Sequence, residues 1–286
     1  MDQYGGDGFV RVAVVQMDVQ TGDVARNLAS AKDGIREALR RKAQVVVLPE
    51  LWDVGYVWRE DSTYPGSRSI QDFAKPLAEN AALDEIKQLA AQNGIWMVAG
   101  SLPERTAAGI YNTAVIIDRQ GNRVHRYRKV HLIGLMDEPE HLESGAGNQP
   151  FLLEGIRAGI IICYDLRFPE SMRSLIYQGA KVIFVVAQWP KIRINHWKTL
   201  IQARAIENQC YVIAANRVGQ GGPDEFPGAS MVVDPMGTIQ IVGGDAPCVL
   251  TDDLDLDRVC EVRRQMPVLN DVNPPAYRTG FSSAPV

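Results

Sequence analysis

The chain has 286 residues, of which 46% are hydrophobic and 22% are charged, which is typical of a globular protein with a sizeable core. Its formal net charge of −4 provides neither a basic surface for nucleic acid nor the polybasic clusters that bind anionic membranes. The longest apolar runs, such as 182–187, are much shorter than the roughly 20 residues that a membrane-spanning helix needs. We therefore expect a small molecule as the main partner.

Residues 1–8 are polar and rich in glycine, and we expect residues 1–9 to form a flexible N-terminal segment. This segment lacks the basic start and the apolar stretch of a secretory signal, which indicates a cytoplasmic protein. The chain has four cysteines, with no C-x-x-C pair and no histidine at metal-ligand spacing. We therefore expect neither disulfides nor a metal site. A single cysteine of this kind is more often a buried packing residue than a reactive thiol.

The two halves of the chain show the same alternation of apolar strands and amphipathic helices. In the first half, the predicted elements are a strand over 10–17, a helix over 27–41, a strand over 44–48, a helical stretch over 69–93, a strand over 95–100 and a hairpin over 111–118 and 123–129. In the second half, they are a strand over 157–163, a helix over 169–178, a strand over 182–187, a helix over 196–209, a strand over 211–216 and a hairpin over 231–234 and 239–242. This order predicts an α/β layered fold, with helices covering the sheets and no linker between the halves.

We expect one domain over 10–260 and a C-terminal extension over 261–286. The extension contains Pro274, Pro275 and Pro285, so its end can be neither a regular helix nor an internal strand. It is predicted to be loose or to pack on a neighbouring subunit.

Two of the apolar strands end in residues that can carry chemistry, namely Glu50 and Cys163. Side chains at the C-terminal end of such strands often form a ligand site, because the strand holds them rigidly while the next loop opens space. A glutamate that leaves a buried strand is expected to be partly desolvated, which favours it as a proton acceptor. The polar, proline-containing turn over 164–170 follows Cys163, and its backbone amides can face an oxyanion.

These residues also have ordinary interpretations. Cys163 can be packing at a strand end, and Glu50 can be an exposed carboxylate. Lys129 can be a surface charge in the basic stretch over 123–131. These features by themselves do not separate the two interpretations.

Three segments, in this order, resemble the signature segments of the nitrilase (carbon-nitrogen hydrolase) superfamily, in its ω-amidase or Nit-like branch. They are LPE at 48–50, RKVHL at 128–132 and ICYDLRFPE at 162–170. The resemblance extends from about residue 10 to residue 257, and three matched segments are far more specific than one. It implies a four-layer α-β-β-α sandwich, in which two similar halves form one domain.

The resemblance implies that Glu50 is the general base, Lys129 stabilises the tetrahedral intermediate and Cys163 is the nucleophile. A thiol is mostly protonated at pH 7, so Glu50 must take its proton before or during attack on an amide carbon. Lys129 and the backbone N–H of Tyr164 would meet the oxyanion, ammonia would leave a thioester, and Glu50 would then activate water. This chemistry needs no metal and no organic cofactor.

The family also has a second glutamate between the lysine and the cysteine, in an E-x(6)-G pattern that Glu138 and Gly145 match. Its implied role is to position the substrate and Lys129. Glu140 and Glu143 are nearby alternatives, and an acidic surface loop is the ordinary interpretation of all three.

The pair Tyr164-Asp165 stands where true nitrilases usually have Trp-Glu, which argues for amides and against nitriles. The resemblance to the ω-amidase branch implies the ω-amide of a 2-oxo or dicarboxylic acid as substrate, such as 2-oxoglutaramate or a methylthio analogue. The alternatives are an N-carbamoyl-amine amidohydrolase and a non-catalytic binding protein with this fold. An intact set of Glu50, Lys129 and Cys163 argues against the binding protein.

Candidate substrate-binding residues lie on the loops of the second half and beside Glu50: Tyr56, Tyr164, Arg167, Gln188, Trp189 and His196. Arg167 or Arg173 would be the cation for a substrate carboxylate. Either arginine can instead be a helix-surface charge or form an ion pair with Asp165 or Glu170. Trp189 can also be a cap on the core.

Members of the family usually pair into a longer α-β-β-α-α-β-β-α stack, in which the C-terminal segment crosses to the partner. The resemblance therefore implies a homodimer or a larger homo-oligomer. The predicted helix over 196–209 carries Ile201, Ala205 and Ile206 at helical spacing, which fits such an interface and ordinary core packing equally.

Overall fold

The computed structural model describes residues 9–57 and 69–277, and its centre is a pair of six-stranded sheets. The first sheet has the order β14-β1-β2-β3-β4-β5, with the β1, β2 and β3 neighbours parallel and the other neighbours antiparallel. Its strands are β1 (Phe9–Gln16), β2 (Val45–Val47), β3 (Trp96–Thr106), β4 (Gly109–Ile117), β5 (Arg123–Arg128) and β14 (Cys248–Asp255).

The second sheet repeats this pattern in the order β13-β12-β9-β8-β7-β6, with β7, β8 and β9 parallel. Its strands are β6 (Phe151–Leu153), β7 (Ile156–Ile162), β8 (Val182–Ala187), β9 (Tyr211–Asn216), β12 (Met231–Val233) and β13 (Ile239–Val242). A separate hairpin is formed by β10 (Val218–Gly221) and β11 (Asp224–Pro227). The shared pattern confirms the prediction of two similar halves.

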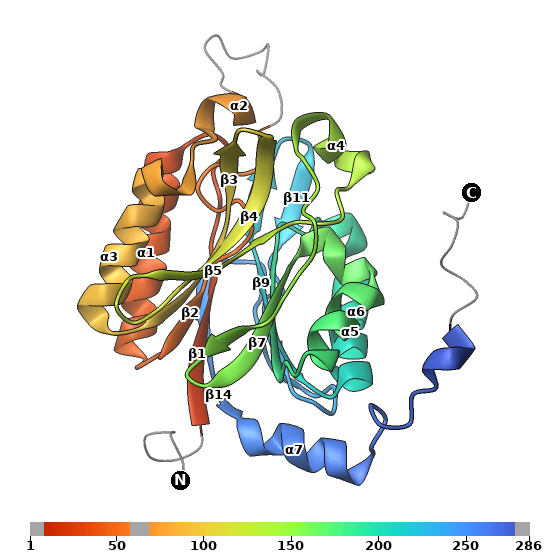
Figure 1. Cartoon of the computed structure of the whole chain (residues 1–286). Coiled ribbons are helices and arrows are strands. Elements are labelled where there is room, and N and C mark those ends of the chain that lie inside the picture. The colour runs from red at the N-terminus through yellow and green to blue at the C-terminus, as the bar shows by residue number, and fades with distance from the viewer. Residues whose placement is uncertain (1–8, 58–68, 278–286) are drawn as a thin grey trace.

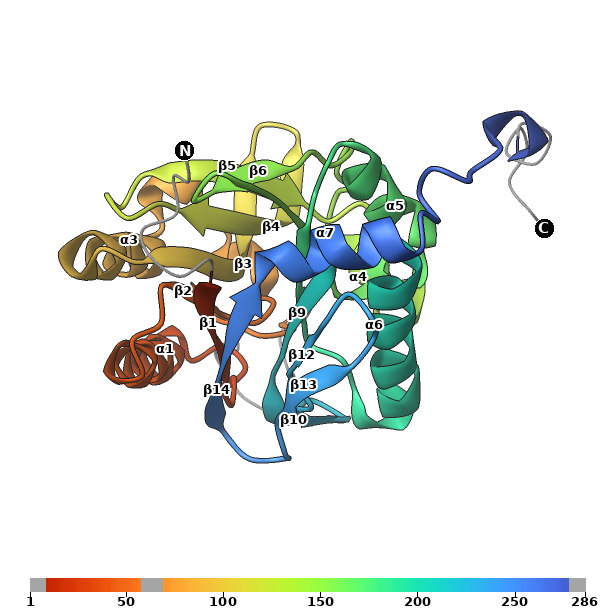
Figure 2. The ribbon, with the colours of Figure 1, turned by 90° about the horizontal axis from the view of Figure 1, so that it is seen from below.

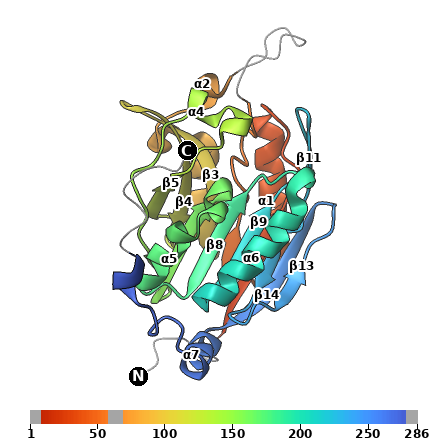
Figure 3. The same ribbon diagram turned by 90° about the vertical axis from the view of Figure 1, so that its right-hand side faces the viewer.

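Helices cover the outer face of each sheet. On the first sheet they are α1 (Val24–Arg40) and α3 (Ala81–Asn93), and on the second they are α5 (Pro169–Tyr177) and α6 (Ile194–Asn208), as Figures 1 and 3 show. The short helices α2 (Ile70–Phe73) and α4 (Glu138–His141) lie at one end of the sandwich, and α7 (Leu256–Gln265) lies at the other (Figure 1). The predicted four-layer α-β-β-α sandwich is confirmed.

The alternation of side chains along the strands explains the layers. Val12 and Val14 belong to the core between the two sheets, whereas Ala13 and Val15 belong to the core beneath α1 and α3. Every residue of β8 is buried, because this parallel strand has the other sheet on one face and helices on the other.

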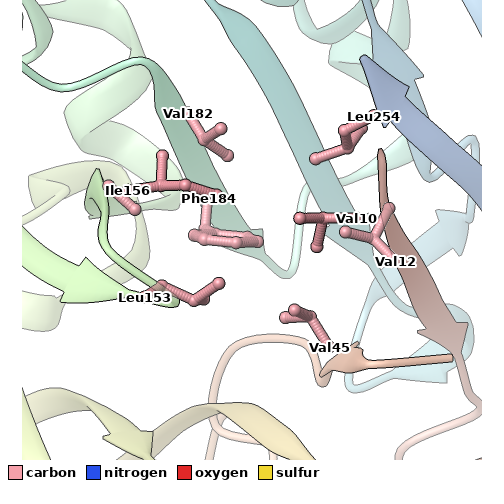
Figure 4. A pocket seen from close by; sticks show the side chains of 9 residues that line it. Val10, Val12, Val45, Leu153, Ile156, Val182, Phe184 and Leu254 are labelled. Atoms are coloured by element: carbon pink, nitrogen blue, oxygen red, sulfur yellow. The ribbon is translucent and has the colours of Figure 1, made fainter. Parts of the chain in front are cut away.

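A small apolar cavity of about 10 Å³ remains between the sheets. Figure 4 shows Val12 and Val45 of the first sheet facing Ile156 and Phe184 of the second across it. The cavity lies where the parallel strands begin, so it is far from the strand ends that carry Glu50 and Cys163.

The helical stretch predicted over 69–93 is not one continuous helix. The structure has α2, a 3-10 turn over Leu77–Glu79 and then α3. Pro76 lies in the interruption and cannot donate a backbone hydrogen bond, while the side chain of Asn80 caps α3 by accepting from Leu83 N at 2.9 Å.

The strand β14 was not predicted, and it returns from the second half to pair antiparallel with β1 at the edge of the first sheet. After α7, the chain runs away from both sheets towards the turn over Pro274–Tyr277 (Figures 1 and 2).

On α6, Ile201 and Ala205 are buried in the core, whereas Ile206 is exposed. Within the described residues, every helix is too short or too polar to span a bilayer.

Candidate active site

Four of the predicted side chains come from four separate segments and gather at one end of the sandwich. Glu50 follows β2, Lys129 follows β5 directly, Cys163 follows β7 directly and Glu138 begins α4. All four residues are buried. Since β2 and β7 lie in different sheets, the site is built where the strand ends of the two sheets approach each other.

The ammonium of Lys129 joins two carboxylates. Its Nζ donates to Glu138 Oε1 at 2.6 Å and to Glu50 Oε1 at 3.0 Å. The other oxygen of Glu138 accepts from the backbone N–H of Ile133 at 2.9 Å, which orients this carboxylate. Glu140 is exposed, so Glu138 is the glutamate of this loop that reaches Lys129.

The buried charges control protonation in the site. Burial disfavours an ammonium, but the carboxylates of Glu138 and Glu50 outweigh this effect and raise the pKa of Lys129, which stays charged. Burial also raises the pKa of Glu138, against the pull of the Lys129 ammonium. Burial and the negative charge of Glu50 raise the pKa of the Cys163 thiol well above its ordinary range. The resting nucleophile is therefore a thiol, and it needs a base.

Cys163 has a strained backbone at the end of β7. Its φ is +44°, in the left-handed region that residues other than glycine rarely adopt. The residue opens a 3-10 turn over Cys163–Arg167, and its Sγ lies 3.9 Å from the carbonyl oxygen of Gln188. The turn thus points a single thiol into the site from a rigid strand.

Asp165 stabilises this turn, and its side chain is fully buried. Its Oδ2 accepts from the backbone N–H of Ile162 at 3.1 Å and from the hydroxyl of Tyr127 at 2.7 Å. Its Oδ1 accepts from the backbone N–H of His131 at 3.0 Å and lies 2.8 Å from His131 Nδ1. Tyr127 and His131 flank Lys129 in the sequence, so Asp165 ties the nucleophile to the lysine.

The carboxylate of Glu50 accepts hydrogen bonds from several segments of the chain. Its Oε1 accepts from Asn112 Nδ2 at 2.8 Å, in addition to Lys129. Its Oε2 accepts from the backbone N–H of Gln188 at 2.8 Å and from the hydroxyl of Tyr56 at 3.0 Å. Two of the predicted substrate-binding residues, Tyr56 and Gln188, therefore contact the general-base candidate.

Arg167, Trp189 and His196 form a cluster beside the nucleophile turn. The guanidinium carbon of Arg167 lies 4.6 Å from the centre of the Trp189 ring and 5.8 Å from that of Tyr164. Its Nη1 lies 3.4 Å from His196 Nδ1. Among the described residues, Arg167 has no carboxylate partner, because Asp165 pairs with His131 instead.

The side chain of Trp189 is buried and does not line an open pocket. Its Nε1 donates to the carbonyl of Arg193 at 2.8 Å, and its ring centre lies 5.5 Å from that of Trp197. One side of the indole thus packs on the core while Arg167 lies over the ring. Arg173, the other candidate cation, lies over the ring of Tyr177 on α5, outside this cluster.

The sequence did not identify Asn112, Asp165 or Arg217 as parts of the site. Arg217 is fully buried, and its Nη1 donates to Gln188 Oε1 at 3.2 Å, which orients the amide whose Nε2 donates to the carbonyl of Glu50. Asn112 interrupts the apolar strand β4, and a buried amide in a strand requires a partner. That interruption was the available signal, whereas nothing local marks Arg217.

Comparison with known proteins gives a family for this chain. A family model described as carbon-nitrogen hydrolase matches residues 11–264. The chain is 37% identical over 268 residues to a 2-oxoglutaramate amidase of Bacillus subtilis (strain 168), which covers 93% of this chain and 98% of the relative. It is 33% identical over 281 residues to a deaminated glutathione amidase of Bos taurus, covering 93% and 83% of the two chains. The crystal structure of a carbon-nitrogen hydrolase from Helicobacter pylori G27 superposes with a TM-score of 0.87 at 24% identity, covering 96% of this chain and 99% of that one.

Proposed function

The chain belongs to the carbon-nitrogen hydrolase family, and from this premise we propose that it hydrolyses the ω-amide of a small 2-oxo or dicarboxylic acid. The family makes it a hydrolase of carbon-nitrogen bonds other than peptide bonds. The products would be the free acid and ammonia, formed through a thioester on Cys163. The observation that carries the proposal is the burial of Glu50, Lys129 and Cys163 together at three strand ends.

In this proposal, Glu50 takes the proton of the Cys163 thiol as the sulfur attacks the amide carbon. The ammonium of Lys129 and the backbone N–H of Tyr164 stabilise the oxyanion, and Glu138 keeps Lys129 charged and in position. Ammonia then leaves with the proton from Glu50, which produces the thioester. Glu50 next takes a proton from water, and the hydroxide hydrolyses the thioester.

Arg167 supports a substrate that carries a carboxylate. A guanidinium that lies over Trp189 and lacks a carboxylate partner among the described residues can bind a substrate carboxylate through two parallel hydrogen bonds. Tyr164, Trp189 and His196 surround this guanidinium and are proposed to complete the substrate pocket. The names of the two amidase relatives agree with such a substrate.

The test is a screen for ammonia release with 2-oxoglutaramate, 2-oxo-4-methylthiobutyramide, succinamate, glutamine, asparagine, N-carbamoyl amines and simple nitriles. We expect 2-oxo acid amides to give the highest kcat/KM, and Cys163→Ala to release no ammonia from any compound. Preference for N-carbamoyl amines would favour the carbamoylase alternative. No turnover of any compound would favour the binding protein.

A matched pair of variants tests the carboxylate site. Arg167→Met should raise KM for the best acid amide by at least about tenfold, because a charge-assisted pair is lost, and should leave a neutral amide such as butyramide unaffected. Arg36→Met, which removes an exposed guanidinium on α1, is the control. Equal loss on charged and neutral amides would contradict the role of Arg167.

We also propose a homodimer or larger homo-oligomer in which residues 261–286 pack on the partner. The support is that Met266 and Val268 are exposed apolar residues on the segment that leaves the body after α7 (Figure 2). Light scattering after size exclusion tests this, and a strict monomer at micromolar concentration would contradict it.

The four free cysteines support a reducing compartment such as the cytoplasm.

A further inference from the structure

Asn112 places one half of its side-chain amide against the general-base candidate. Its Nδ2 donates to Glu50 Oε1 at 2.8 Å. Because an ionised carboxylate only accepts hydrogen bonds, this contact fixes which half of the amide faces Glu50. The other half, Oδ1, has no hydrogen-bond partner among the described residues, although the side chain is fully buried. A buried acceptor without a partner costs free energy, so this oxygen indicates a missing donor.

The pairing of β4 with β5 places this oxygen beside the catalytic groups. Asn112 lies opposite Lys129, whose backbone N–H donates to the carbonyl of Asn112 at 2.9 Å. Opposite residues of an antiparallel pair point their side chains to the same face, and both of these side chains reach Glu50 Oε1. Oδ1 and Nδ2 belong to one planar amide group. Oδ1 therefore lies next to the carboxylate with which the Cys163 thiol interacts.

Lys129 offers the opposite kind of group. An ammonium has three N–H donors, and two of those of Lys129 reach Glu138 at 2.6 Å and Glu50 at 3.0 Å. The third has no partner among the described residues. Two neighbours of Glu50 thus provide one unused donor and one unused acceptor. A primary carboxamide carries the complement, namely a carbonyl oxygen that accepts and an NH2 group that donates, whereas an ester carries only acceptors.

We propose that Asn112 is a catalytic residue whose Oδ1 accepts a hydrogen bond from the NH2 group of the substrate amide and so selects amides over esters. The third N–H of Lys129 binds the carbonyl oxygen, which becomes the oxyanion. When the C–N bond breaks, its electron pair stays on nitrogen and takes the proton from Glu50, so ammonia leaves. Asn112 holds an N–H of this nitrogen, which turns the electron pair towards Glu50. This inference rests on the proposed function and deepens it.

The test compares an acid amide with the methyl ester of the same acid, such as succinamate with monomethyl succinate. Both would form the same thioester on Cys163, so kcat/KM isolates the step in which ammonia or methanol leaves. The ester leaves Oδ1 of Asn112 unpaired, and a site built to bind an N–H discriminates against a substrate that lacks it. Wild type should therefore have the higher kcat/KM with the amide, although esters are the more reactive compounds in water.

Two variants separate the acceptor of Asn112 from its donor. Asn112→Leu removes both and should lower the ratio of amide to ester kcat/KM by about 10- to 100-fold. The lost contact with Glu50 slows both substrates, whereas the lost Oδ1 affects the amide alone. Asn112→Asp keeps an oxygen acceptor, so its ratio should stay close to that of wild type even if both reactions are slower. A ratio measured in one preparation does not depend on the fraction of folded enzyme.

Asn208→Leu is the matched control. Asn208 is also fully buried and its Oδ1 also lacks a partner among the described residues, but it ends α6 just before β9 begins, at the opposite end of the sheet from the site. Its ratio should equal that of wild type.

An unchanged ratio in Asn112→Leu would overturn the inference, because Asn112 would then act only through Glu50 or hold a buried water. An equal fall of the ratio in Asn112→Asp would also overturn it. In both cases amides are still hydrolysed and the proposed function stands. Wild type that turns over neither the amide nor the ester would contradict the proposed function and the role of Asn112 together.

Discussion

Lys129 and Glu138 form a buried ion pair with a distance of 2.6 Å between Nζ and Oε1, and neither side chain exposes any surface to solvent. The ammonium also reaches Glu50, so one positive charge is shared by two carboxylates. A charge placed in this way is oriented before the reaction begins, which is the property that makes a group effective towards a developing oxyanion.

Glu138→Gln keeps a side-chain oxygen near Lys129 but removes the negative charge. We expect kcat to fall by about 10- to 100-fold with little change in KM, because the residue acts through Lys129. Steady-state kinetics with the best amide measure this. Glu140→Gln, on the exposed face of the same short helix, should leave kcat unchanged. Equal effects of the two substitutions would contradict the assignment.

The positive φ of Cys163 predicts an unusual order of stability among inactive variants. Cys163→Gly should be more stable than Cys163→Ala by about 1 kcal/mol, because glycine adopts φ = +44° without strain. Denaturant unfolding measures the difference. Cys210 is also buried, but its φ is not positive. At this position we therefore expect Cys210→Gly to be less stable than Cys210→Ala. The same order at both positions would show that Cys163 is not strained.

Asp165→Asn should lower the free energy of unfolding by about 2–4 kcal/mol, because the amide cannot accept all the hydrogen bonds that the buried carboxylate accepts from the Tyr127 hydroxyl, the Ile162 and His131 backbone amides and the His131 ring. The same substitution at Asp253 breaks an exposed pair with Arg11 at 2.6 Å, and should cost at most about 1 kcal/mol. Chemical denaturation measures the free energy of unfolding of both variants. Similar losses of stability would contradict the role of Asp165.

Asp53 predicts a dependence of stability on pH. Burial raises its pKa from 3.8 to about 7, so the folded protein binds this proton more tightly than the unfolded chain does. The stability contributed by Asp53 should therefore fall as the pH rises from about 4 to about 7, by at most about 4 kcal/mol.

Asp53→Asn does not titrate, so the free energy of unfolding of wild type minus that of the variant should decrease across this range. Urea unfolding at several pH values measures the difference. A flat difference across this range would contradict the predicted shift.

Much of the fold followed from local patterns. The strands over 182–187, 211–216 and 239–242 were predicted with the bounds that the structure has, because buried apolar runs between turn residues are a strong local signal. The helical stretch predicted over 69–93 is divided in the structure, because the helical sequence pattern continues through Pro76 whereas the helical backbone is interrupted there. The strand β14 was not predicted. Its partner β1 lies near the other end of the chain, so no local pattern reports their pairing.

The positions of Glu50 and Cys163 at the ends of buried strands could be predicted from the sequence, because apolar runs and their ends are local properties. It also placed both in segments that resemble one enzyme family, and the family is confirmed. The groups that surround these two side chains depend on how distant segments pack together. Gln188, a donor to Glu50, is 138 residues away in the chain, and no local pattern reports a contact of that length. The proton affinity of a buried carboxylate depends on such donors, so the chemistry of the site is decided by packing.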